Sequence, residues 1–166
     1  MSTIVRLTSS GGTVNFKITP KITESRVTQY VDVGLQSASG IAMYTVTDNR
    51  KYSINAMFAS RTEAEALENY RYIHLLKSWH YPEDDNGEAK PLIVKLSGYR
   101  NQFQSIPMVL SSLTIDFPDD VDYIHTSTAS VPIIQTVNAS FIEAHSTDEG
   151  EAFSIERFRQ GLMPGF

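Results

Sequence analysis

A single long helix is predicted in the middle of a chain that otherwise has the pattern of short β-strands. Residues 60–81 repeat apolar side chains at three-residue steps, the spacing of one helix face. Ser60 and Thr62 each stand three residues before a glutamate, so either can be the N-cap, and Pro82 ends the helix. The predicted apolar stripe is Leu67, Tyr70, Ile73 and Leu76, with Ala66 and Trp79 beside it. One helix between two blocks of strands predicts a mainly β protein.

The segments before the helix are predicted to form two hairpins. Residues 3–8 and 14–18 flank a glycine pair and make a polar edge hairpin. Residues 41–47 carry apolar side chains on both faces, which indicates a strand with no fully solvated side. An Asp-Asn dipeptide then predicts a tight turn, after which residues 52–58 pair back with that strand.

Further elements are predicted on both sides of the helix. They are strands at residues 24–33, 92–96, 108–117 and 132–144, a flexible loop at 36–40, a turn at 98–105, and acidic turns at 83–90 and 118–122. In the strand 108–117, Met108 is expected on the outer face. The expected core face of that strand is Val109, Ser111, Leu113, Ile115 and Phe117.

Composition narrows the class of protein. With 166 residues, 41% of them hydrophobic, the chain suits one domain with a substantial core. Its formal charge of −5 argues against tight wrapping of nucleic acid. There is no cysteine, so disulfides and thiolate metal sites are excluded. We find neither a secretory signal nor an apolar run of about 20 residues, and therefore expect a protein that does not insert into a membrane.

No catalytic, cofactor-binding or metal-binding residue is predicted. The acidic stretch 83–88 lacks the spacing of a calcium-binding EF-hand loop. Nucleophile elbows, phosphate-binding glycine loops and dinucleotide fingerprints are absent from the sequence. The histidines are scattered along the chain at His74, His80, His125 and His145. We therefore expect a protein that is not an enzyme and needs no cofactor.

The order of these segments resembles a family of viral assembly proteins. Strand hairpins lead into Phe58-Ala-Ser-Arg-Thr-Glu-Ala-Glu-Ala66, and the helix then runs through Leu75-Leu-Lys-Ser-Trp79. Strands follow at Pro91–Gly98 and Pro107–Phe117, and a last strand ends in Phe141-Ile-Glu143. Across residues 13–145 this pattern is similar to the tail-tube-like proteins of contractile phage tails, in particular the baseplate proteins that initiate the tube.

This resemblance implies a fold, a domain division and an assembly. The fold is a tail-tube-like β-barrel or sandwich with a flanking helix, spanning residues 1–145, followed by a C-terminal extension over residues 146–166. Members of the family form rings, usually hexamers, by joining sheets across subunits, which satisfies open sheet edges. The implied partners are further copies of the chain and neighbouring tail tube and baseplate proteins, with DNA only as passing cargo. The implied location is the virion, assembled in the host cytoplasm.

Two groups of residues are predicted at a subunit interface. The first is the two-sided apolar strand together with the end of the helix, and the second is a short amphipathic segment near the C-terminus. The expected interface residues are Ile41, Met43, Tyr44, Val46, Trp79, Phe153, Ile155 and Phe158.

Other functions remain open at this point. A main tail tube protein polymerises indefinitely, whereas an initiator stops at one ring, and the sequence does not separate the two. A non-enzymatic β-domain that binds carbohydrate or peptide is the alternative from another class. An exposed aromatic platform around Trp79 would favour that alternative.

Overall fold

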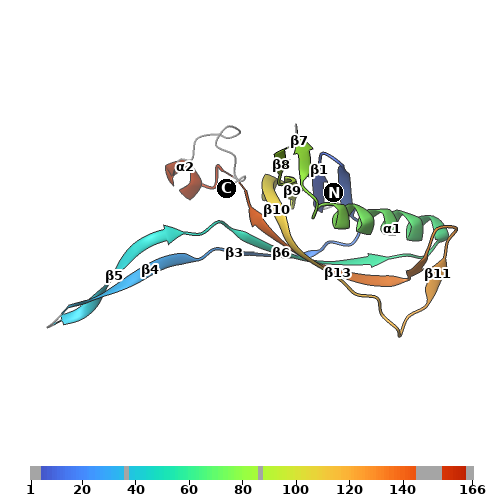
Figure 1. Ribbon diagram of the computed structural model, residues 1–166, viewed down its shortest axis with the longest axis horizontal. Helices are drawn as coiled ribbons and strands as arrows, with labels where there is room; N and C mark the ends of the chain where they lie inside the picture. The colour runs from blue at the N-terminus through green and yellow to red at the C-terminus, as the bar shows by residue number, and fades with distance from the viewer. Residues whose placement is uncertain (1–4, 36–37, 86–87, 145–154, 164–166) are drawn as a thin grey trace.

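The computed structural model describes residues 5–35, 38–85, 88–144 and 155–163, and its elements form a β-rich body from which a long β-ribbon projects. Figure 1 shows this ribbon, β4 and β5, extending away from the body, with helix α1 lying on the opposite half of the molecule. The predicted fold class, mainly β with one main helix, is confirmed.

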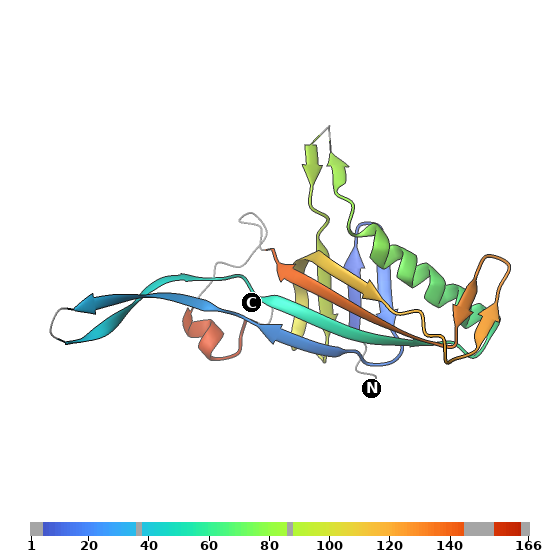
Figure 2. The same cartoon turned by 60° about the horizontal axis from the view of Figure 1, so that its bottom comes forward.

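A seven-stranded antiparallel sheet builds the body. Figure 2 shows β1, β2 and β9 crossing behind β10, β13 and β6, so the bent sheet forms two layers. In the described part of the chain, β2 and β3 are its free edges, which makes a sandwich and not a closed barrel. In spatial order the strands are β2 (Gly12–Phe16), β1 (Val5–Ser9), β9 (Val94–Gly98), β10 (Phe103–Ile115), β13 (Ile134–Glu143), β6 (Lys51–Ala59) and β3 (Lys21–Ser25).

The core lies between the two layers. Phe16 of β2 and Phe58 of β6 meet with ring centroids 5.9 Å apart, and Tyr52 of β6 meets Phe103 of β10 edge to face at 6.1 Å. The predicted strand 132–144 is β13, and its burial alternates as the period-two spacing of Ile133, Gln135, Val137, Ala139 and Phe141 predicts. Its buried side chains are Gln135, Val137, Ala139, Phe141 and Glu143.

Helix α1 (Glu63–Ser78) covers the open side of this core and is shorter than the predicted 60–81. Thr62 is the N-cap, as expected, and its Oγ1 accepts a hydrogen bond from the Glu65 backbone N–H at 3.3 Å. The buried stripe differs from the prediction by about one residue, because Leu67 and Tyr70 are only half-buried. The residues that face the core are Ala66, Asn69, Ile73, Leu76 and Trp79.

Asn69 is the polar member of that stripe, and its amide explains why it is buried. Its Nδ2 donates to the Ala59 carbonyl at 3.0 Å and to the Ser60 Oγ at 2.7 Å. The helix is therefore tied by hydrogen bonds to the end of β6.

The pairing of strands 41–47 and 52–58 was predicted wrongly. Strand β5 (Ala38–Thr47) pairs with β4 (Thr28–Leu35), whereas β6 pairs with β3 and β13. The register runs on from Lys21↔Asn55 to Leu35↔Ala38, so the four strands form one long ribbon with its bend near residue 48. The Asp-Asn dipeptide is a bend within the ribbon, where the Asp48 N–H donates to the Val27 carbonyl at 2.9 Å. Strand β5 also begins inside the segment predicted as a loop, of which residues 36 and 37 lie outside the described residues.

Strand β10 contains a bulge, so it departs from the predicted core face before the bulge, whereas Leu113 and Ile115 beyond it pack against the core as predicted. Its pairing with β13 shifts register between Leu110 and Ser112, and such a shift turns the following side chains to the other face. Met108, expected on the outer face, is fully buried ahead of the bulge. Phe117 lies beyond the strand and is exposed, contrary to prediction.

Short elements complete the fold. The predicted strand 92–96 is β9, and the predicted turn before β10 contains three consecutive residues, Tyr99, Arg100 and Asn101, with left-handed φ angles of 49–74°. The acidic stretch 83–90, predicted as a loop, contains a small hairpin. The remaining elements are β7 (Glu83–Asp85), β8 (Glu88–Lys90), β11 (Tyr123–His125), β12 (Ser130–Pro132) and α2 (Ile155–Arg159).

Candidate subunit interface

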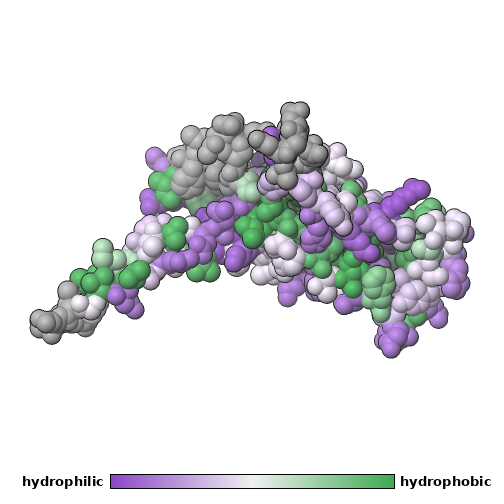
Figure 3. All heavy atoms as spheres, viewed as in Figure 1, coloured by the Kyte–Doolittle hydropathy of each residue, from purple (hydrophilic) through white to green (hydrophobic). Residues whose placement is uncertain are grey.

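The ribbon formed by residues 27–47, hereafter the arm, exposes an unusual number of large apolar side chains. Eight of the seventeen exposed large hydrophobic side chains among the described residues lie on it, each between 39% and 62% exposed. Figure 3 shows hydrophobic side chains gathered along the arm, away from the body. The eight are Val27, Tyr30, Val31, Val33, Ile41, Met43, Tyr44 and Val46. Contiguous apolar surface of this kind marks a contact site.

Cross-strand pairing sorts most of these side chains onto two faces. One face, called the aliphatic face, pairs Val31 with Met43 and Val33 with Ile41. The other, called the tyrosine face, pairs Tyr30 with Tyr44 and Asp32 with Ala42. The two tyrosine rings meet edge to face at 6.3 Å. The predicted alternation of Ile41 and Met43 against Tyr44 is therefore present in the structure.

The backbone of the arm is also available for contact. Strands β4 and β5 pair only with each other among the described residues, so the outer edge of each has unpaired backbone groups. An isolated two-stranded hairpin is at best marginally stable in water. The arm therefore gains stability from any surface that covers its faces or extends its edges.

A buried ion-pair cluster lies where the arm joins the sheet. Arg50 donates through Nε to Oε2 of Glu143 at 2.5 Å and through Nη1 to Oε1 of Glu24 at 2.8 Å. Arg26 donates to Oε1 of Glu143 at 3.2 Å, and the Tyr52 hydroxyl donates to Glu24 at 3.0 Å. These contacts join β3, β6 and β13 to Arg26 and Arg50, which flank the arm on its two strands, and so orient its base.

Burial and charge at this cluster act on its ionisable groups in opposite directions. Burial disfavours the charge of Arg50, but the hydrogen bond and charge of Glu143 outweigh it and raise the Arg50 pKa above its ordinary value. Burial raises the pKa of Tyr52 far above its ordinary value. The arginine is therefore charged and the tyrosine neutral at neutral pH.

The predicted interface residues lie in three places, which are the arm, α2 and, at the end of α1, Trp79. Ile41, Met43, Tyr44 and Val46 lie together on the arm and are exposed. Ile155 and Phe158 are exposed on α2, while Phe153 lies outside the described residues.

Trp79 was predicted wrongly as a surface contact. Its side chain is only 3% exposed and packs in the core with Ile73 and Leu76. The helix repeat that carries those two residues inward also carries Trp79 inward, three residues beyond Leu76. An exposed aromatic platform around Trp79 is thus not present.

The exposed residues on the first strand of the arm were missed as interface candidates. The segment 24–33 is predicted only as a strand, and it contains Val27, Tyr30, Val31 and Val33. The signal that marks them is charge, because Asp32 is the single charged residue between positions 27 and 47. A long stretch without charge in an exposed ribbon is unusual for a protein surface.

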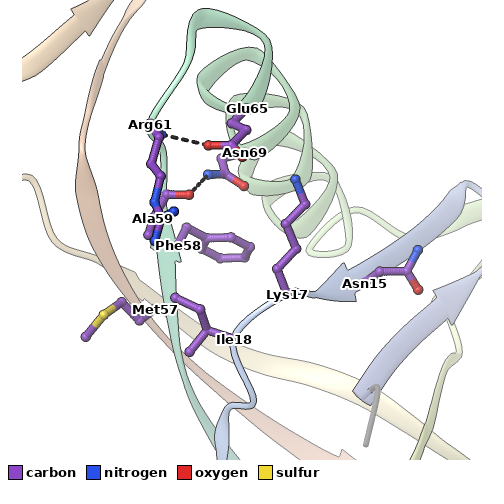
Figure 4. A pocket seen from close by; sticks show the side chains of 9 residues that line it. All are labelled: Asn15, Lys17, Ile18, Met57, Phe58, Ala59, Arg61, Glu65 and Asn69. Carbon is purple, nitrogen blue, oxygen red and sulfur yellow. Dashed lines mark hydrogen bonds between the residues drawn. The ribbon is translucent and has the colours of Figure 1, made fainter. Parts of the chain in front are cut away.

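A groove on the body lies between the end of β2, the end of β6 and the start of α1. It has a volume of about 160 Å³. Figure 4 shows the Phe58 ring in the groove, with Lys17 reaching up toward the helix, Ile18 below the ring, and Met57 pointing away from it on the other face of β6. Arg61 lines it from the junction between β6 and α1.

The described residues contain no group of three or more histidine, aspartate or glutamate side chains arranged to hold a metal ion. Within those same residues, no helix is both long and apolar enough to cross a membrane.

No protein-family model and no curated protein matches the chain. Among solved structures, a chain described as "Tail of empty GTA particle computed with helical refinement, C6 symmetry" is similar at a TM-score of 0.38 and 16% identity. The alignment covers 86% of this chain and 91% of that chain. A likeness this weak assigns neither a family nor a function.

Proposed function

We propose that this chain is a structural, non-enzymatic subunit of a phage-like tail, which joins copies of itself into a ring through its arm. The observation that carries the proposal is the arm itself, with apolar side chains on both faces and free backbone edges. A chain that exposes such a ribbon gains most when another subunit covers it.

The fold of the body supports the same role. A bent antiparallel sheet with one long helix across its open side agrees with the fold that the tail-tube resemblance implies. The free edge at β3 also suits an assembly in which sheets continue from one subunit to the next.

Within this role, we propose a ring at the baseplate end of the tail, on which the tube is built and through which DNA passes. A hexamer is the ring size that the resemblance implies. Its neighbours are then tube and baseplate proteins, and its location is the virion. The main tube protein is the alternative position for the same fold, and it differs in forming filaments without limit.

Light scattering on the purified chain over a range of concentrations, with negative-stain imaging, tests the proposal. Rings of fixed size support the initiator, and filaments support the main tube protein. A single-chain mass at every concentration, together with no capture of tube or baseplate proteins, would contradict a structural role in a tail.

A further inference from the structure

The groove between β2, β6 and α1 combines exposed apolar side chains with a cation. Ile18 is 41% exposed beside the buried Phe58 ring, and Met57, 45% exposed, stands at the rim on the outer face of β6. The Arg61 guanidinium makes no ion pair or side-chain hydrogen bond with another described residue. Such a groove suits a ligand with aromatic surface and one carboxylate.

The other charged groups around this groove are already engaged. Lys17 Nζ lies 2.6 Å from Oε2 of Glu68. The Glu65 carboxylate accepts the Arg61 backbone N–H at 2.7 Å. This leaves the Arg61 guanidinium as the lining cation with the capacity to bind an incoming carboxylate.

The tyrosine face of the arm has the complementary chemistry. Tyr30 and Tyr44 are 61% and 62% exposed, and Asp32 lies on the same face as the pair. Tyrosine and arginine are the residues that most often supply binding energy at protein interfaces. Because Asp32 is the arm's only charge, it needs one cation on the surface that covers it.

The unpaired side of β2 beside the groove is covered by α1. Leu75 of the helix lies beside Gly12, and Glu68 bonds to Lys17 just after the strand. The groove is therefore entered by side chains, and Tyr30 and Tyr44 are the large exposed side chains that the tyrosine face offers to it.

We propose that the arm of one copy docks in the β2–β6–α1 groove of the next copy, with Tyr30 and Tyr44 against Ile18 at the mouth of the groove, and Asp32 paired with Arg61. This inference rests on the proposed self-assembly and specifies its contact. It leaves the aliphatic face of the arm to a second neighbour.

A smaller groove is the principal rival for the arm. It has a volume of about 60 Å³ between α1 and the β11–β12 hairpin, and Phe117 and Lys77 line it. The β2–β6–α1 groove is larger than this rival and places the Arg61 guanidinium beside the exposed Ile18, which favours it for a ribbon with aromatic side chains and one carboxylate.

Site-specific cross-linking tests the contact directly, because the chain has no native cysteine. Ala42→Cys, on the tyrosine face, is mixed with Ile18→Cys at the mouth of the groove, and a short thiol-to-thiol cross-linker is added. The expected product is a heterodimer that neither variant forms alone to the same extent. Phe117→Cys and the distant Ile93→Cys, paired with Ala42→Cys in the same way, are the controls.

The outcomes of that experiment distinguish a wrong groove, a wrong face of the arm and a failure of self-assembly. The assigned groove is overturned if Ala42→Cys cross-links more to Phe117→Cys than to the groove cysteine, or equally well to Ile93→Cys. This holds even where light scattering shows rings. A mixture that neither cross-links nor assembles overturns the proposed self-assembly as well. Cross-linking from Val31→Cys in place of Ala42→Cys would show that the opposite face docks, and would also overturn the assignment.

Charge reversal gives an independent measure. Asp32→Arg and Arg61→Asp are each expected to raise the concentration needed for assembly at least tenfold, and the double variant is expected to recover most of that loss. Two single losses without recovery in the double variant would contradict the ion pair. Circular dichroism of all three variants checks that they fold.

Discussion

Arg50 and Glu143 form a buried ion pair at the base of the arm, with Nε and Oε2 separated by 2.5 Å. Removal of one partner leaves the other charge uncompensated in the interior. We therefore expect Arg50→Met to lower the free energy of unfolding by about 3–5 kcal/mol. Urea denaturation followed by circular dichroism measures this loss.

The double variant Arg50→Met, Glu143→Leu is the matched comparison. With both charges of the pair removed, the loss should be clearly smaller than for Arg50→Met alone. If Arg50→Met costs less than about 1 kcal/mol, the pair is not the buried anchor that its contacts indicate.

The exposed pair Lys17 and Glu68 predicts a small pH dependence. The hydrogen bond from Lys17 lowers the pKa of Glu68 below its ordinary 4.5, and the bond to Glu68 raises the pKa of Lys17 above 10.5. The Glu68 contribution is therefore complete above pH 4.5 and is lost as pH falls through the folded pKa. The Lys17 contribution is complete below pH 10.5 and is lost as pH rises through its folded pKa.

Both side chains of this pair are about half exposed, so the effect is at most about 1 kcal/mol. Comparison of urea midpoints at pH 7 and pH 3 should show a slightly smaller acid loss for Glu68→Gln than for the unmodified protein. An equal acid loss in both would mean that the pair contributes nothing to stability.

Trp79 should act as a core residue and leave assembly unaffected. Trp79→Ala creates a cavity and is expected to cost about 3–5 kcal/mol. Its Nε1 has no hydrogen-bond partner among the described residues, so Trp79→Phe removes an unsatisfied donor and should cost less than half as much. Circular dichroism during denaturation measures both. A Trp79→Ala variant of unchanged stability but altered assembly would show that the Trp79 indole lies at the subunit interface.

Local patterns in the sequence predicted the parts of the fold that depend on local chemistry. The capping hydroxyl of Thr62 and the alternation of β13 follow from neighbouring residues, and both are confirmed. The partner of residues 52–58 was not predictable in this way, because β13, some eighty residues away, supplies most of its pairing. The turn predicted at Asp48 led instead to a predicted pairing with the neighbouring residues 41–47.

The candidate interface was predicted in part for a related reason. The two-sided apolar pattern of residues 41–47 is visible in the sequence, and the structure places it on the arm. That residues 28–35 form the second strand of the same arm depends on the register between β4 and β5. Trp79 was misplaced because aromatic character alone does not show which helix face the core covers.

The most direct test of the account is the mass in solution of variants that alter one face of the arm at a time. Met43→Glu changes the aliphatic face and Tyr44→Glu the tyrosine face, while Ile93→Glu places the same charge on the body. We predict that both arm variants reduce the assembled mass toward that of one chain, and that Ile93→Glu assembles as the unmodified protein does. Rings that persist in both arm variants would contradict the claim that the arm joins the subunits.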